Sequence, residues 1–119
     1  MGRLEGKAQG FLPLTEATFC ILAALGGARH GYAVMQRVER ASRGRIRLGP
    51  GTLYGALTKL QQQGLIERTG EALEGGERRK LYVLTALGRE VVTLETRRLV
   101  ETVAVARELL GTQGGLNGD

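Results

Sequence analysis

The 119-residue sequence has one cysteine, one histidine and no tryptophan. A single cysteine excludes an intrachain disulfide, and with only one histidine there is no cluster with the ligand spacing of a metal site. No glycine-rich phosphate loop or catalytic constellation is present, so an enzyme or a cofactor site is poorly supported. No apolar run approaches the roughly 20 residues needed to cross a bilayer, and residues 1–13 lack the apolar core of a secretory signal. We therefore expect a cytoplasmic protein outside any membrane that is not an enzyme and holds neither cofactor nor metal.

Acidic residues are scarce in the middle of the chain. Residues 29–80 hold eleven Lys and Arg against five Glu, whereas the remainder holds six basic residues against seven acidic ones. The net charge of +5 therefore comes from one segment. A basic excess confined in this way indicates a surface for a polyanion such as nucleic acid, although a solvated basic face would give the same count.

The centre of this segment predicts a single helix that begins at Pro50 and ends just before Gly64. Pro50 suits the first helical position, and Gly64 suits the left-handed residue just past the end. Leu53, Leu57 and Leu60 fall at helical spacing and predict one narrow buried face. This is the element around which the other segments are arranged.

The opposite face of this helix carries no acidic residue. Its candidate DNA contacts are Gly51, Thr52, Tyr54, Gly55, Thr58 and Lys59. Hydroxyl groups and a lysine can meet phosphates and base edges without repelling them. The alternative is an ordinary amphipathic helix with a solvated polar face, and Tyr54, at the edge of the apolar face, also suits a packing role.

Two helices are expected before the central one. Residues 1–13 predict a loose arm, after which Thr15 suits the N-cap of a helix that stops at Gly26-Gly27. His30 opens a second helix of about 11 residues and is expected to order that turn rather than to bind a metal.

Short strands are expected on both sides of the central helix. Residues 45–48 alternate basic and apolar side chains, which predicts a half-buried strand. Residues 65–69 and 79–84 predict two more strands, which close around a basic loop over residues 70–78. The candidates for phosphate or minor-groove contact in these segments are Arg45, Arg47, Arg78, Arg79 and Lys80. A solvated run of charges is the alternative for all five.

This order of helices and strands is typical of a winged helix-turn-helix domain over residues 14–84. The predicted fold is therefore mainly α with a small β wing. Because that fold also serves protein assembly, a protein–protein interaction module without DNA binding is the alternative function.

A long helix is predicted over residues 85–110, with Thr85 as its cap. Its apolar stripe outruns the small domain, so much of the stripe needs another surface, for which we expect a second copy of the chain. The expected dimer contacts are Phe19, Leu22, Val91, Leu94, Leu99, Val103, Ala106 and Leu110. Residues 111–119 predict a disordered tail.

Four segments resemble the PadR family of transcriptional regulators. They are Arg29 to Tyr32, Leu48 to Tyr54, Gly64 to Ile66, and Arg78 to Thr85 followed by Gly88-Arg89. The resemblance covers residues 13–110, and its most specific part is Pro-Gly-Thr-Leu-Tyr combined with the later Tyr-x-Leu-Thr-x-x-Gly. The single closing helix is similar to that of the short subclass, which dimerises through it.

The resemblance implies a winged helix-turn-helix homodimer that binds an inverted repeat in double-stranded operator DNA and usually represses. It implies that Gly51, Thr52 and Tyr54 meet the DNA backbone, with Lys59 further along the helix. It also allows a small-molecule effector held between the subunits.

Two positions depart from the family pattern. Gly49 stands where a Ser or Thr usually caps the central helix, at a cost of about a few tenths of a kcal/mol. Gly55 replaces a larger and often basic residue, so base readout there is not implied. Either Gly55 lets the helix backbone approach DNA closely, or it is simply tolerated although it destabilises the helix by ~1 kcal/mol relative to Ala.

The last helix lacks the aromatic side chains on which an aromatic effector would stack. None of the five Phe and Tyr residues lies on it, which argues against a stacking pocket between the subunits. Arg97 and Arg98 would instead tolerate an anionic effector.

Overall fold

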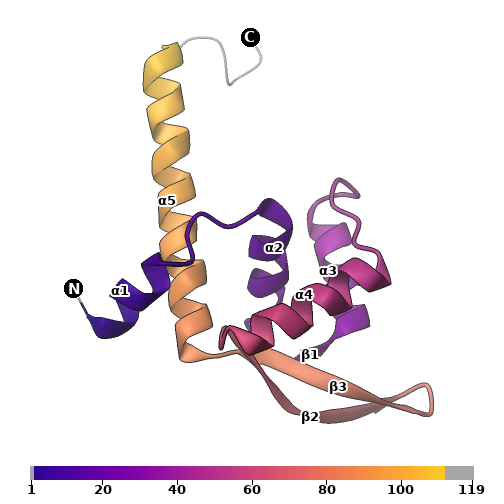
Figure 1. Ribbon diagram of the computed structural model, residues 1–119. Coiled ribbons are helices and arrows are strands. Elements are labelled where there is room, and N and C mark those ends of the chain that lie inside the picture. Colours follow the sequence, from indigo (N-terminus) through magenta and orange to yellow (C-terminus); the bar gives the residue numbers. More distant parts are fainter. Residues whose placement is uncertain (1, 112–119) are drawn as a thin grey trace.

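The computed structural model describes residues 2–111, which form a helical domain with a small antiparallel sheet and one long projecting helix (Figure 1). The elements are α1 (Arg3–Gln9), α2 (Glu16–Ala24), β1 (Arg29–His30), α3 (Gly31–Ala41), α4 (Pro50–Gln62), β2 (Ile66–Glu74), β3 (Glu77–Leu84) and α5 (Ala86–Leu110). The strand order in the sheet is β1-β3-β2, so β3 lies in the middle. The tail predicted to be disordered lies, from residue 112, outside the described residues.

The core lies where α2, α3 and α4 meet the base of the sheet and the first turns of α5. Its fully buried large side chains include Ile21, Leu22, Leu25, Val34, Leu53, Leu57, Leu65, Ile66 and Val91. Each such side chain contributes about 1.5–3 kcal/mol on burial. The leucine face predicted for α4 is therefore confirmed, and it fixes which side of that helix faces water.

Thr15 and Thr85 cap their helices as predicted, and His30, expected to order the turn before α3, caps that helix. The Thr15 hydroxyl accepts the Thr18 N–H, and His30 Nδ1 accepts the Ala33 N–H at 3.1 Å. The Thr85 hydroxyl accepts a backbone N–H of α5 and donates to the Gly64 carbonyl at 2.6 Å. Thr85 thus joins the end of α4 to the start of α5.

The prediction of a loose arm is wrong for residues 3–9, which form α1. This helix packs against α5 (Figure 1). Its Ala8 is fully buried. Downstream, the Leu14 N–H donates to the buried carboxylate of Glu95 at 2.7 Å. Arg98 hydrogen-bonds the same carboxylate and holds the pKa of Glu95 below its ordinary value, although burial opposes this. The N-terminal segment is therefore held against α5 by packing and by a charge-assisted hydrogen bond.

The predicted strand over residues 45–48 is also wrong. There the Ile46 N–H donates to the Ser42 hydroxyl at 2.9 Å, a local bond that replaces pairing with a strand. The third strand is instead β1, which pairs Arg29 with Tyr82 and His30 with Leu81.

The wing is longer than predicted. Most of residues 70–78, expected to be a loop, belong to β2 and β3, and the tip is only the Gly75-Gly76 turn. Both glycines have positive φ, 60° and 82°, as a two-residue hairpin turn of this kind requires.

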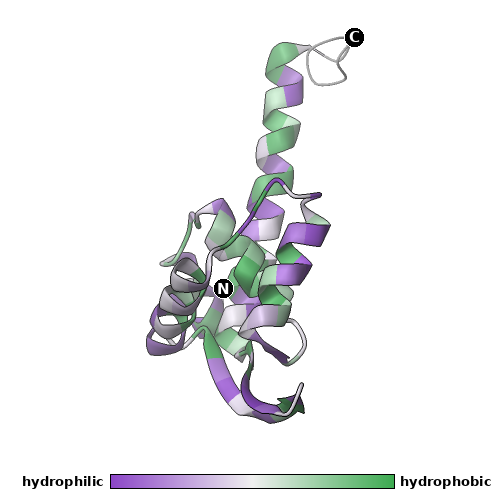
Figure 2. Cartoon of the chain, turned by 90° about the vertical axis from the view of Figure 1, so that its right-hand side faces the viewer, coloured by the Kyte–Doolittle hydropathy of each residue, from purple (hydrophilic) through white to green (hydrophobic). Residues whose placement is uncertain are grey.

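The second half of α5 stands free of the domain (Figures 1 and 2). Its exposed large apolar side chains are Leu99, Val100, Val103, Val105, Leu109 and Leu110, with exposed fractions from 37% to 80%. Within residues 2–111, no helix combines the length and the apolar character that a membrane span requires.

Candidate nucleic-acid interface

The outward face of α4 holds all six residues predicted for it. Gly51, Thr52, Tyr54, Gly55, Thr58 and Lys59 are exposed, and α4 contains no acidic residue. Gly49 provides no side-chain cap, so N–H groups of the first turn are left for solvent or an anion. This face is suited to an anionic partner.

Tyr54 is partly exposed and also packed against a neighbouring element. Its side chain is 46% exposed, yet its ring lies against the backbone of Gly31 at the start of α3. A Cβ on Gly31 would come within 2.7 Å of the ring, so only glycine permits this approach. The Tyr54 atoms nearest Gly31 are Cε1, Cζ and the hydroxyl oxygen, so the contact fixes the hydroxyl end of the ring.

A groove of about 410 Å³ runs between α4 and the wing. It is lined by His30, Gly31, Tyr54, Thr58, Glu77, Arg78, Arg79, Lys80 and Tyr82. The wing residues predicted from the sequence therefore lie next to two of the α4 residues. Hydroxyl groups on the α4 side face basic side chains on the β3 side, an arrangement that fits a phosphate backbone.

The cations of the wing are not equally free. The Arg78 side chain is 76% exposed, with the Glu71 carboxylate 3.8 Å away. Arg79 is half-buried: its guanidinium lies over the Tyr32 ring, 5.8 Å from the centroid, and 3.9 Å from Glu77. Among the described residues, Arg78 and Lys80 are thus better placed than Arg79 to meet a ligand.

The wing is also less basic than expected. Residues 66–80 hold four Lys and Arg and four Glu, whereas residues 29–65 hold seven basic residues and one Glu. The basic excess therefore belongs to α3, α4 and the loop between them. The wing therefore contributes two or three basic side chains at defined positions rather than a strong positive electrostatic field.

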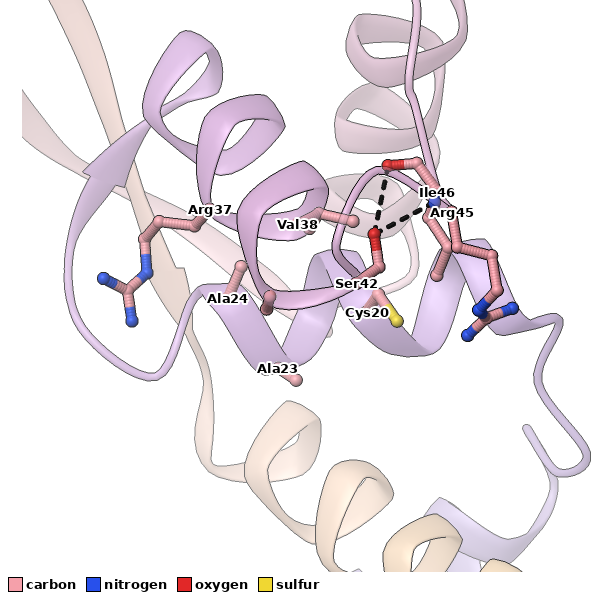
Figure 3. A pocket seen from close by; sticks show the side chains of 9 residues that line it. Cys20, Ala23, Ala24, Arg37, Val38, Ser42, Arg45 and Ile46 are labelled. Carbon is pink, nitrogen blue, oxygen red and sulfur yellow. Dashed lines mark hydrogen bonds between the residues drawn. The ribbon is translucent and has the colours of Figure 1, made fainter.

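Arg45 lies away from this groove. Its guanidinium donates to the Glu16 carboxylate at 2.7 Å, which raises the pKa of Arg45. It lines a separate hollow of about 320 Å³ between α2 and α3, with Arg37 towards the other end (Figure 3). Arg47 is exposed in the same loop, beside Gly44.

Residues 21–102 match the family described as the Transcriptional regulator PadR-like family. The chain belongs to this family. The resemblance noted in the sequence is thereby confirmed, and with it the winged helix-turn-helix fold and the expectation of a regulator rather than an enzyme. The family match spans every element that lines the groove.

Two relatives are similar to most of this chain. A transcriptional regulator of Mycobacterium tuberculosis, Rv3488, is 37% identical over 90 residues, which are 76% of this chain and 78% of that protein. A 37.1 kDa protein of a Streptomyces fradiae transposon is 38% identical over 85 residues, but the match spans only 23% of its length.

Solved structures of PadR proteins share the fold. A PadR-like regulator from Bacillus cereus has 24% identity and a TM-score of 0.67, covering 92% of this chain and 99% of that one. Bacillus subtilis PadR, solved in complex with operator DNA, has 23% identity and a TM-score of 0.58 over 68% of this chain and 46% of that one.

Four residues that line this groove were not predicted as contacts: His30, Gly31, Glu77 and Tyr82. His30 and Gly31 belong to the Arg29 to Tyr32 segment that carried the resemblance, and Glu77 adds one carboxylate to the groove. The motif drew attention to this segment of the sequence. Its place in the groove, however, depends on wing residues far along the chain. Across residues 2–111, no group of His, Cys, Asp or Glu is arranged to hold a metal ion.

Proposed function

We propose that this PadR-like regulator binds an inverted repeat in double-stranded DNA as a homodimer and represses transcription there. The observation that carries the proposal is the acid-free, exposed face of α4 beside a groove lined by Arg78 and Lys80. The operator complex of Bacillus subtilis PadR supports it, because that protein shares this fold.

In this proposal α4 enters the major groove with its N-terminus towards a phosphate. Gly51, Thr52 and Tyr54 contact the backbone, and the helix dipole favours the negative charge there. Gly55, Thr58 and Lys59 follow on the same face and lie closest to the base edges.

The dimer rests on the free half of α5. Leu22 and Val91 are fully buried within their own chain, and Leu94 is 8% exposed, so these three serve the monomer core. The dimer seam therefore relies on Leu99, Val103, Ala106 and Leu110, with help from the half-buried Phe19 on α2.

No effector is part of the proposal. Arg98 already bonds Glu95, and the hollow beside Arg97 is also lined by Glu5 and Glu101. These carboxylates disfavour the anion that the two arginines alone would tolerate.

The deciding experiment is an electrophoretic mobility shift followed by footprinting on DNA upstream of the gene itself. We expect a discrete complex that protects two half-sites related by two-fold symmetry. Equal, weak binding to every duplex would leave the protein–protein interaction module as the better description.

The wing prediction concerns salt. We expect Arg78→Ala and Lys80→Ala each to weaken binding to all duplexes similarly and to lower the slope of log affinity against log salt by about one. Arg3→Ala, which removes an exposed charge from α1, is the control and should leave the slope unchanged. Unchanged slopes in both folded wing variants would remove the wing from the interface.

The Tyr54 prediction separates its two roles. Tyr54→Phe keeps Cε1 and Cζ of the ring against Gly31 and deletes only the hydroxyl, which also lies beside Gly31. We expect the melting temperature to stay the same and DNA binding to lose roughly 0.5–1.5 kcal/mol, the net value of one hydrogen bond. Equal affinity of the two proteins, measured by fluorescence anisotropy, would reduce Tyr54 to a packing residue.

A further inference from the structure

We propose that Glu74 is a positioning residue for DNA binding, which anchors the wing to the start of α3 through His30. This proposal rests on the proposed function and adds a residue that does not itself touch DNA. It explains how a hairpin carrying Arg78 and Lys80 keeps a fixed place beside α4.

The anchor is one imidazole with two partners. His30 Nδ1 accepts the Ala33 N–H and so caps α3, which leaves the ring proton on Nε2. Nε2 donates to the Glu74 carboxylate at 2.5 Å, and only 8% of His30 is exposed. The side chain that begins α3 therefore also holds the wing.

The contact requires the hairpin to curl. Strand pairing sets both His30 and Gly70 opposite Leu81, and Glu74 lies four residues further along β2. In a flat sheet His30 and Glu74 would be about 13 Å apart along the strands and about 10 Å apart across β3. The bulge between Arg68 and Gly70, where Gly70 has a φ of 139°, supplies the bend.

A second contact acts on the same part of the wing. The stacking of Arg79 on Tyr32 joins β3 to the first turn of α3. Arg78 and Lys80 flank Arg79 on β3, so both lie between the tip anchor and the pairing with β1. Releasing the tip lets this stretch swing away from α4 and take its two cations with it.

Whether DNA affinity rises or falls when Glu74 is removed distinguishes a positioning role from simple electrostatic repulsion. Removing an acidic group near a DNA-binding face ordinarily strengthens binding, because repulsion of the phosphates is relieved. If Glu74 positions the wing, its removal weakens binding instead. Glu74→Gln removes the charge but keeps a carbonyl oxygen that can accept from His30 Nε2.

The test compares Glu74→Ala, Glu74→Gln and the matched control Glu71→Gln, which removes another wing carboxylate, one that pairs with Arg68 and lies near Arg78. We expect Glu74→Ala to bind operator DNA roughly three- to tenfold more weakly. Glu74→Gln and Glu71→Gln should bind as tightly as the unaltered protein or more tightly. Binding by Glu74→Ala that is equal to or tighter than that of the unaltered protein overturns the proposal.

Two further measurements make the assignment specific. In a background with both Arg78 and Lys80 replaced by Ala, Glu74→Ala should have no additional effect on affinity, because the cations that it positions are gone. Without any DNA, amide exchange over residues 70–80 should be faster in Glu74→Ala than in Glu74→Gln. If the unaltered protein binds no duplex, the proposed function fails, and the exchange result alone still decides whether Glu74 anchors the wing.

Discussion

Replacing Leu99 by Glu is expected to convert the dimer into monomers and to abolish operator binding, although no DNA-facing residue changes. Leu99, Val103 and Leu110 lie on the projecting half of α5 and are 37%, 45% and 61% exposed in the single chain. Leaving such side chains in water forgoes about 1.5–3 kcal/mol each. That sum is comparable to the whole stability of a small domain, about 5–15 kcal/mol.

A carboxylate at position 99 would lie within the seam, close to its copy on the partner. Burying two like charges costs far more than the contact returns. A monomer carries one α4 and therefore holds one half-site at a time. The two-fold dimer, by contrast, should span half-sites about one helical turn apart, roughly 34–36 Å, or a multiple of this.

Light scattering at micromolar concentration tests the dimer directly. The matched control is Ala104→Glu, which adds the same charge to the same exposed stretch but about 140° around the helix from Leu99. This control should remain dimeric and bind DNA. A stable folded monomer formed by the unaltered chain would contradict both the dimer and the palindromic operator.

The features that could be predicted from the sequence are those that depend on neighbours a few residues apart. The caps at Thr15, His30 and Thr85 bond to N–H groups three residues on, so the local pattern reveals them. The buried and exposed faces of α4 follow from helical spacing in the same way. These features were sufficient to locate the exposed face of α4 that forms part of the candidate interface.

The features that were missed depend on distant partners. α1 contains only two apolar residues, Leu4 and Ala8, and it gains its place by packing on α5, some 90 positions along the chain. β1 has only two residues and exists because β3 pairs with it. No periodicity in a two-residue or seven-residue segment could have indicated either.

Distant partners also explain why some of the basic residues predicted to contact DNA are less accessible than expected. Arg45 appeared free in the sequence but bonds Glu16, 29 positions earlier, and Arg79 stacks on Tyr32. Charge on its own predicts a basic surface, whereas the availability of each cation depends on the carboxylates and rings that the fold brings to it. Arg78 and Lys80 remain candidates for phosphate contact because the wing leaves them exposed beside α4.

The largest effect on stability is expected at Gly88, in the first turn of α5. A Cβ there would lie 2.0 Å from the Leu65 carbonyl oxygen and 3.0 Å from its carbon, so Gly88→Ala clashes with backbone rather than with a flexible side chain. The carbonyl cannot easily retreat, because it accepts the Thr85 N–H at 3.1 Å.

We therefore expect Gly88→Ala to lose at least about 3 kcal/mol of unfolding free energy, at or beyond the upper range for overpacking. Gly55→Ala is the matched control, because a Cβ at this exposed helical position has no atom within 4 Å. It should gain about 0.5–1 kcal/mol from helix propensity. Urea denaturation of the three proteins measures both changes, and the midpoint should fall for Gly88→Ala and rise for Gly55→Ala. An unchanged midpoint for Gly88→Ala would contradict the close packing of the first turn of α5 against the Leu65 backbone.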